Sequence, residues 1–412
     1  MEELMYYVWQ QRLFSAIHTL DNTPLEIIHP GLRNLDAGPD FFNAKIKIGD
    51  IMWAGNVEMH VKASDWYRHH HQDDQAYNSV ILHVVMEADT VIERPSGDTI
   101  QMVVMRIPDA ITQRYHTLVS EGKNLFCAIR CQQFLHSVPS LIVHDWLSAL
   151  ATQRMLRKAD RVKDLILQNH ESWQEALYVI LSRSLGTGIN SDAFERLARS
   201  LPYAFLLKHL DDPLQVRALL LGQAGLIPTD DQRLLNEYTF LRAKFQLKPM
   251  QASDWKMARR RPQASPEKRI EALAQLLSSH RELFSEILDT LQIAQLQRIF
   301  ILPQLIGTQT ANSIIINAII PILISYGQWS ADSDLCDRAI ELLESLPAEN
   351  NRYIDYWSQA GIQSNNAFDT QALLHLYREY CEPHKCINCR IGCWLIKTPD
   401  PTSPNRSKPL PF

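Results

Sequence analysis

Residues Ala37–Trp66 read AGPDFFNAKIKIGDIMWAGNVEMHVKASDW, and this stretch decides the fold predicted for the N-terminal part of the chain. Two runs, Phe42–Ile48 (FNAKIKI) and Ile51–Val61 (IMWAGNVEMHV), flank the dipeptide Gly49-Asp50. Alternation of apolar and polar residues is typical of a half-buried strand, and a Gly-Asp pair between two such runs indicates a tight turn. The stretch therefore predicts a β-hairpin.

Two acids stand on this hairpin. Asp40 lies at the mouth of the first strand, and Glu58 lies on the returning strand, where His60 and Lys62 follow at a spacing of two on the same face. A turn at Gly49-Asp50 pairs Asp40 with residue 59 or 60, which lets it approach Glu58. Two adjacent carboxylates repel unless a proton or a cation separates them, and Mg²⁺ or Mn²⁺ is the cation that we expect there.

A simpler interpretation of the same acids needs no metal. Asp40 could cap a turn, and Glu58 could form a cross-strand ion pair with Lys45 or Lys47. Both interpretations stay open at this point.

The hairpin has strands and helices around it. A helical pattern opens the chain, Leu25–Ile28 reads as a short strand, and Ser79–Met86 (SVILHVVM) is an unbroken apolar strand that we expect to be buried on both faces. Thr90–Ile107 reads as a further hairpin. The predicted order is helix, three strands, helix, strand, and then the added hairpin.

This arrangement resembles the PD-(D/E)xK nuclease superfamily. In that resemblance Pro39-Asp40 is the "PD", Glu58 is the second acid, and His60 occupies the lysine position, where Lys62 could substitute from the same face. The resemblance implies a restriction-endonuclease-like mixed sheet and metal-dependent phosphodiester hydrolysis. Glu26 on the preceding strand could supply a third carboxylate.

Longer strings identify a second resemblance that spans nearly the whole chain. They include AGPDFFNAKIKI, LGTGINSDAFERLARSLP, LLLGQAGLIP and YCEPHKCINCRIG. On these strings the chain resembles the bacterial family known as domain of unknown function 2851. That resemblance implies no activity, so the nuclease hypothesis depends on the hairpin.

Beyond about residue 133 the pattern changes to helices, with apolar residues three and four apart. We predict an α+β chain divided into a nuclease-like domain over residues 1–132, a larger all-α domain over 133–397 that ends in a cysteine-rich motif, and a Pro-rich tail over 398–412. The most apolar run, Ile314–Gly327, contains Asn317 and Pro321 and is predicted to be a buried helix.

Histidines offer a different site. Ser64–Tyr77 (SDWYRHHHQDDQAY) contains three of them, and on a helix His69 and Asp73, or His70 and Asp74, would lie four residues apart. A histidine-carboxylate zinc or manganese site is the corresponding hypothesis, with histidines on an exposed loop as the alternative. His83, within the following strand, is interpreted as a core histidine.

Four of the seven cysteines lie close together near the C-terminus. They have the spacing C-x4-C-x2-C-x3-C and are Cys381, Cys386, Cys389 and Cys393. We predict Zn²⁺ there, with an iron–sulfur cluster as the weaker alternative and reduced thiols as the simplest one. Cys127 and Cys131 could complete such a site if the tail folds back.

Charge and composition narrow the function further. The formal net charge is −5, so contact with DNA or RNA would need a local basic patch, and Lys256 with Arg259, Arg260 and Arg261 is the candidate. The first 13 residues lack the features of a signal peptide, and we expect a cytoplasmic protein without a membrane partner. The hypotheses are a metal-dependent nuclease, an inactive nuclease-like module that binds nucleic acid or protein, and a hydrolase or metal-storage protein that uses the histidines.

Overall fold

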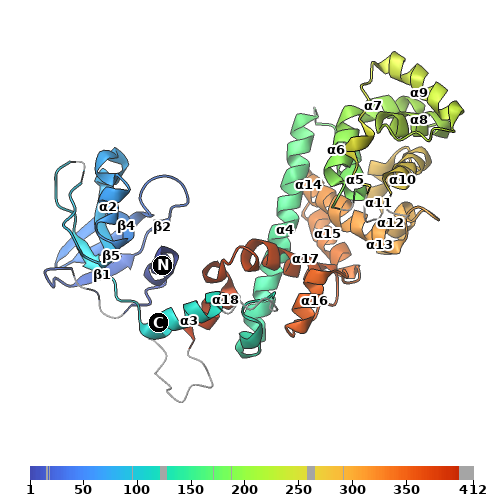
Figure 1. The fold of residues 1–412 in the computed structure, drawn as a ribbon. Helices are drawn as coiled ribbons and strands as arrows, with labels where there is room; N and C mark the ends of the chain where they lie inside the picture. The colour runs from blue at the N-terminus through green and yellow to red at the C-terminus, as the bar shows by residue number, and fades with distance from the viewer. Residues whose placement is uncertain are drawn as a thin grey trace. The chain divides into compact units, whose positions relative to one another are not determined.

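The computed structural model describes residues 1–14, 17, 19–94, 96–120, 128–169, 171–186, 188–257, 265–290 and 292–398. The chain forms two compact units (Figure 1). Unit 1 comprises Met1–Trp146 and Tyr377–Phe412, and unit 2 comprises Leu147–Leu376. The units differ from the domain ranges expected from the sequence, because the cysteine-rich segment belongs to unit 1 and not to the helical unit. The expected domain ranges stay a prediction.

Unit 1 contains a six-stranded mixed sheet. The strands are β1 (Leu25–His29), β2 (Leu32–Arg33), β3 (Phe41–Ile48), β4 (Ile51–Lys62), β5 (Val80–Glu87) and β6 (Met102–Val104). Their order is β1-β3-β4-β5-β6, and β2 pairs with β3 beside β1. The β1–β3 and β3–β4 pairs are antiparallel, whereas β5 runs parallel to both β4 and β6. The chain is therefore α+β with a mixed N-terminal sheet, as the sequence predicts.

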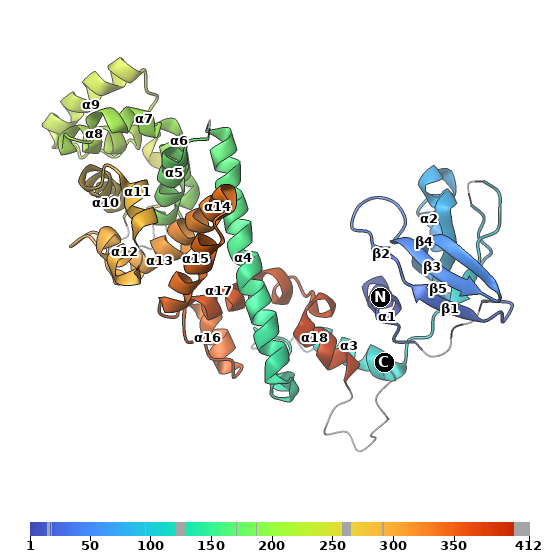
Figure 2. The ribbon, with the colours of Figure 1, turned by 180° about the vertical axis from the view of Figure 1, so that it is seen from behind.

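The predicted central hairpin is present as β3 and β4 (Figure 2). Ile48 lies opposite Ile51 across its turn. The prediction for Ser79–Met86 is also confirmed, because the first six residues of β5 are buried. The second predicted hairpin forms only next to its turn, where Glu93 pairs antiparallel with Thr99 and the Ile100 N–H donates to the Ile92 carbonyl at 3.0 Å. The residues that follow join the sheet as β6, parallel to β5, where Met102 and Val103 are buried. Burial of these two side chains favours the sheet edge over a local partner strand.

The two faces of the sheet have different neighbours. Val57 and Met59 of β4 pack in one core with α1 (Glu2–Gln10) and α3 (Asp109–Ser120). The intervening residues of β4 point to the other face, where a second small core gathers around Trp66 of α2 (Asp65–Arg68). Because side chains alternate along a strand, this second face is the one that receives Glu58 and His60.

The remainder of unit 1 is helical. It contains η1 (His71–Asp73), η2 (Gln75–Ser79), η4 (Gln132–Ser137), the first residues of α4 (Ser140–Gln168), the π-helix η9 (Tyr377–Cys381), η10 (Cys386–Asn388) and α18 (Arg390–Lys397). Hydrogen bonds connect the C-terminal helix α18 to residues of the N-terminal part of unit 1. The Tyr7 hydroxyl donates to the Cys393 carbonyl at 3.1 Å, and Arg114 donates to the Ile396 carbonyl at 2.9 Å.

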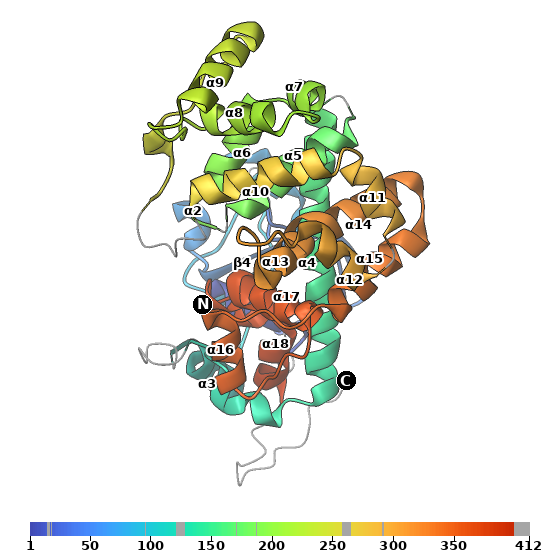
Figure 3. The ribbon, with the colours of Figure 1, turned by 90° about the vertical axis from the view of Figure 1, so that its right-hand side faces the viewer.

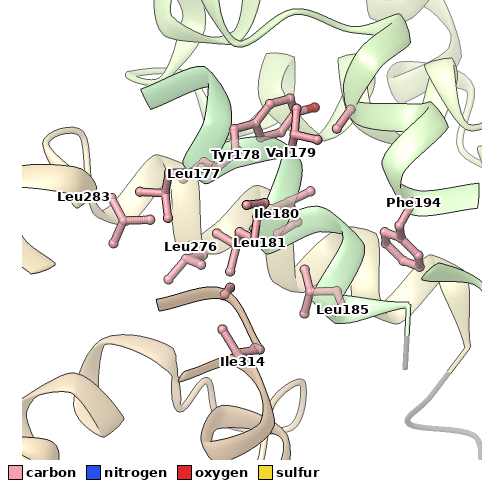
Figure 4. Packing of buried hydrophobic residues seen from close by; sticks show 14 of the residues in the cluster. Leu177, Tyr178, Val179, Ile180, Leu181, Leu185, Phe194, Leu276, Leu283 and Ile314 are labelled. Atoms are coloured by element: carbon pink, nitrogen blue, oxygen red, sulfur yellow. The ribbon is translucent and has the colours of Figure 1, made fainter. Parts of the chain in front are cut away.

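Unit 2 consists of packed helices, as the sequence predicts. They are the rest of α4, α5 (Trp173–Leu185), α6 (Ser191–Ser200), α7 (Tyr203–Leu206), η5 (Leu207–His209), α8 (Pro213–Gln223), α9 (Gln232–Phe245), η6 (Ala252–Asp254), α10 (Pro266–Ser279), α11 (Leu283–Asp289), α12 (Ile293–Phe300), α13 (Thr308–Ile314), η8 (Ile315–Ile319), α14 (Ile320–Ser330), α15 (Ser333–Ser345), α16 (Arg352–Gln359) and α17 (Ala367–Leu376). Figure 3 shows α8 and α9 at one end of this unit and α16 at the other. Side chains such as Leu181, Leu276 and Ile314 from separate helices meet in its core (Figure 4).

The most apolar part of the chain lies inside this core. Helices α13 and α14 and the π-turn η8 form one continuous helix, Thr308–Ser330, whose most apolar 18-residue window is 78% buried. By length and composition alone it could cross a membrane, and no other helix in the described parts of the chain could. The helix extends beyond the predicted segment at both ends, and Pro321, which cannot donate a backbone hydrogen bond, lies directly after the π-helical turn Ile315–Ile319. The prediction of a buried helix is confirmed.

Candidate functional site

Asp40 and Glu58 lie side by side at the start of β3. The backbone N–H of Asp40 donates to Glu58 Oε2 at 3.0 Å, and the backbone N–H of Met59 donates to Asp40 Oδ2 at 3.0 Å. This follows from the register, which places Phe41 opposite Val57. Glu58 forms no ion pair with Lys45 or Lys47, which lie further along the hairpin opposite Ala54 and Met52.

Arg33 is the counterion of Asp40, and sequence reasoning missed it. Its Nη1 lies 2.9 Å from Asp40 Oδ1 and also donates to the Asp40 carbonyl at 3.1 Å. The guanidinium carbon stands 3.6 Å from the ring centroid of Tyr6, so a cation–π contact holds it in place. The two-residue strand β2 positions Arg33 against β3, and no local pattern in the sequence marks so short a strand.

Two histidines lie next to the Glu58 carboxylate, and two more contact one of them. His60 Nε2 and His71 Nε2 lie 3.5 Å and 3.3 Å from Glu58 Oε1. His60 also bridges two other imidazoles, with Nδ1 at 2.9 Å from His83 Nε2 and Nε2 at 3.1 Å from His69 Nδ1. One nitrogen from each of His60, His69 and His71 lies within 4.8 Å of the other two, which is close enough for a shared metal ion.

The turn after α2 brings two of these histidines inward. Helix α2 ends at Arg68, and His70 takes a left-handed conformation with φ of 61°. His70 therefore points outward toward Asp73, while His69 and His71 turn toward β4. His71 stacks on Tyr77 with 3.9 Å between ring centroids. The helical spacing assumed for His69 with Asp73 and for His70 with Asp74 does not occur, because the helix ends too early.

The pKa values of these groups reflect burial. Desolvation, together with the neighbouring Asp40 carboxylate, raises the pKa of Glu58 to about 9, and burial raises the pKa of Asp40 as well. Burial and the adjacent imidazoles lower the pKa of His60 to about 2 and that of His83 to about 3. At neutral pH the metal-free cluster therefore keeps a proton on Glu58 and leaves these two imidazoles uncharged.

The donor set fits a divalent metal ion. In the described part of the chain His83 Nδ1 is buried without a hydrogen-bond partner, and His71 Nε2 is buried 3.3 Å from Glu58 Oε1 without forming a hydrogen bond. Such orphaned nitrogens are uncommon in folded proteins and call for an explanation. A cation held by Glu58, His60, His69 and His71 would satisfy the His71 nitrogen and offset the buried carboxylate. Mixed imidazole and carboxylate ligands suit Mn²⁺ or Zn²⁺ better than Mg²⁺.

Two other predicted site residues lie apart from this cluster. Lys62 is half exposed and pairs with Glu87 of β5 at 3.2 Å. Glu26 is exposed on β1 opposite Lys47, at the far end of the hairpin from Asp40. The structure brings together Asp40, Glu58 and His60 but not these two residues.

The predicted nucleic-acid patch is only partly described. Lys256 is exposed in unit 2, and its backbone N–H donates to Asn190 Oδ1 at 2.9 Å. Arg259, Arg260 and Arg261 lie outside the described residues, as does Cys127 of the predicted cysteine site. The other cysteines of that site all belong to unit 1.

Comparison with known proteins gives a family but no relative of known function. A family model described as "Protein of unknown function (DUF2851)" matches residues 2–304 and 302–352. The chain belongs to this family. No curated protein and no solved structure matches the chain.

Proposed function

We propose that this protein is a metal-dependent phosphodiesterase that acts on DNA or RNA at the site formed by Asp40, Glu58 and His60. One observation carries the proposal. The buried carboxylate of Glu58 stands beside the partly buried carboxylate of Asp40 on a hairpin, and the imidazoles of His60, His69 and His71 converge next to them. Ionisable groups are buried together at a cost in stability, which is typical of functional sites.

The strand order supports the same proposal. The PD-(D/E)xK resemblance implies a helix, three strands, a helix and a further strand. Here α1 precedes β1, β3 and β4 of an antiparallel meander, and α2 then precedes β5, which returns parallel to β4. The short strand β2 is an addition to that order. Likeness of fold alone is a weak guide to chemistry, so the side chains carry more weight than the topology.

The residues of this chain have separable roles in the proposed reaction. Glu58, His60, His69 and His71 would hold Mn²⁺, or Mg²⁺ with lower preference, and Asp40 would face the same ion. A bound divalent ion supplies Lewis acidity toward the phosphate and a more acidic water. Arg33 keeps a fixed positive charge beside Asp40.

In this chain His60 stands where the PD-(D/E)xK resemblance expects a lysine. His60 is buried with a lowered pKa, so it is uncharged at neutral pH and cannot neutralise charge on a phosphate as an ammonium group does. Lys62 points to Glu87 instead. Charge neutralisation in the proposed reaction would therefore come from the metal and from Arg33. Contact with the nucleic-acid backbone by Lys256, Arg259, Arg260 and Arg261 is part of the proposal.

The same observations favour one alternative. A nuclease-like module without a lysine at the site, and with Asp40 already paired to Arg33, could bind nucleic acid or a protein partner without cleaving it. In that case the cluster would hold a metal for structural reasons.

A cleavage assay separates the two. Full-length protein freed of metal is incubated with single- and double-stranded DNA and RNA, with Mn²⁺, Mg²⁺ or EDTA. We expect cleavage with Mn²⁺ above that with Mg²⁺, abolished in Asp40→Ala and Glu58→Ala. Glu87→Ala, which removes an exposed acid from the neighbouring strand, is the matched control and should cleave normally. If the parent protein binds nucleic acid without cleaving it, or if all variants cleave equally, the proposal of a nuclease is refuted.

A further inference from the structure

The cysteines of unit 1 form a second cluster, distinct from the histidine site. Four thiols line a single pocket together with Arg130. They belong to Cys131, Cys381, Cys386 and Cys389. These four cysteines are not the four of the C-x4-C-x2-C-x3-C motif. Cys131, from the N-terminal part of the chain, lines the pocket in place of Cys393.

Local structure explains how the C-terminal segment presents three of these thiols. Cys381 ends the π-helix η9, Cys386 begins η10, and Cys389 precedes the first turn of α18. Burial raises the pKa of the Cys389 thiol, and the backbone amides of Ile391 and Gly392 at the start of α18 oppose that rise.

Gly392 is required for this turn. A Cβ atom at position 392 would lie 2.1 Å from the Cys386 carbonyl oxygen, which is closer than any side chain allows. The close approach folds the Cys386–Cys389 turn against α18. A larger residue at position 392 would push the Cys386 backbone away from α18.

Cys393 is held in another way. Its sulfur donates to the Ile387 carbonyl at 2.9 Å, and it does not line the pocket. Its backbone carbonyl accepts the hydrogen bond from Tyr7. Cys393 therefore serves the attachment of α18 to α1, and its thiol is already engaged.

The thiols that line the pocket are too far apart for one bound ion to contact three of them. A single Zn²⁺ ion with Zn–S bonds of about 2.3 Å draws its four sulfurs to within about 3.8 Å of one another. Among the described cysteines no three sulfurs lie within 4.8 Å of one another. A cluster of several iron and sulfide ions spaces its cysteine ligands more widely than a single ion does.

We propose that Cys131, Cys381, Cys386 and Cys389 bind an iron–sulfur cluster that joins the C-terminal segment to the N-terminal part of unit 1. The cluster closes a loop of most of the chain length, so it stabilises unit 1 by restricting the unfolded chain. The proposal is independent of nuclease activity, because none of its ligands belongs to the histidine site.

The test begins with full-length protein purified without oxygen. Iron, zinc and acid-labile sulfide are measured together with the visible absorption spectrum. We expect iron and sulfide in equal amounts and a broad visible absorption. Cys131→Ser and Cys386→Ser should lose at least about nine-tenths of the iron, whereas Cys393→Ser should keep it. Zinc without iron, or iron lost in Cys393→Ser but kept in Cys131→Ser, would overturn the proposal.

A second measurement covers the case in which a variant fails to fold. Thiol alkylation of the native parent protein is followed by mass spectrometry before and after the iron is removed with an oxidant and a chelator. We expect labelling of the four cysteines to rise together by at least about tenfold, because a cluster protects all its ligands. Unchanged labelling of Cys131 would exclude it as a ligand. Cys336, which lies in unit 2, is the internal control and should label equally in both states.

Discussion

Replacing Glu58 with Gln should stabilise the metal-free protein at neutral pH. Glu58 is 4% exposed, and its pKa rises from an ordinary value of 4.5 to about 9 in the folded chain. Gln keeps an oxygen that accepts the Asp40 N–H, and its amide group can donate to His71 Nε2, which lies 3.3 Å from Glu58 Oε1. The substitution therefore removes the titration and leaves the shape of the site nearly unchanged.

The size of the effect follows from proton linkage. The folded chain holds a proton on Glu58 that the unfolded chain releases above pH 4.5, so the free energy of unfolding falls as pH rises from 4.5 toward 9. Each pH unit in that window costs about 1.4 kcal/mol, which amounts to about 3 kcal/mol at pH 7. The free energy of unfolding of the Glu58→Gln protein should therefore exceed that of the parent by this amount at pH 7 and by almost nothing at pH 4.5.

Hydrogen exchange measures this without assuming that the two units unfold together. The protein is treated with EDTA, and exchange in peptides from β4 and β5 reports the opening of unit 1 as a function of urea and pH. Glu87→Gln, at an exposed ion pair on the same sheet, should shift the free energy of opening by less than about 1 kcal/mol. A Glu58→Gln protein that is no more stable than the parent at pH 7, or equally changed at pH 7 and pH 4.5, would refute the reasoning.

Three further predictions concern metal binding, sheet packing and helix capping. His71→Ala should weaken Mn²⁺ binding about 10- to 100-fold by calorimetry, and the outward-pointing neighbour variant His70→Ala should leave it unchanged. Gly55→Ala should destabilise unit 1 by about 1–3 kcal/mol in urea unfolding, because the new Cβ would lie 2.4 Å from Ile81 Cγ2; an unchanged transition would contradict that packing. Asp212→Ala should cost about 1 kcal/mol, since its side chain caps the first turn of α8, and equal exchange of the amides in that turn would argue against the cap.

Much of the fold could be predicted from local pattern. The central hairpin and the buried strand β5 lie within one residue of their expected ends, and the buried apolar helix includes the predicted segment, because side-chain periodicity and turn residues act over a few neighbouring positions. The proximity of Asp40 and Glu58 follows from the same hairpin register. Capping acids such as Asp212 and Asp332 likewise stand immediately before the helices that they start.

The pairing of distant segments could not be predicted in this way. The sequence offers no signal that β6 pairs parallel with β5 or that the two residues of β2 place Arg33 on Asp40. Such contacts depend on which apolar surfaces the whole chain can bury together, and many arrangements satisfy the same local pattern.

The sequence alone determined the α+β class, the acid pair on one hairpin and the presence of a histidine-rich segment, since each depends on spacing within one short stretch. Only the tertiary structure decided which histidines face Glu58, because the left-handed turn at His70 and the neighbouring strand β5 set their directions. It also decided that Cys131 joins the C-terminal cysteines. Ligands from distant segments meet only when the core between them has folded, and no local pattern encodes that distance.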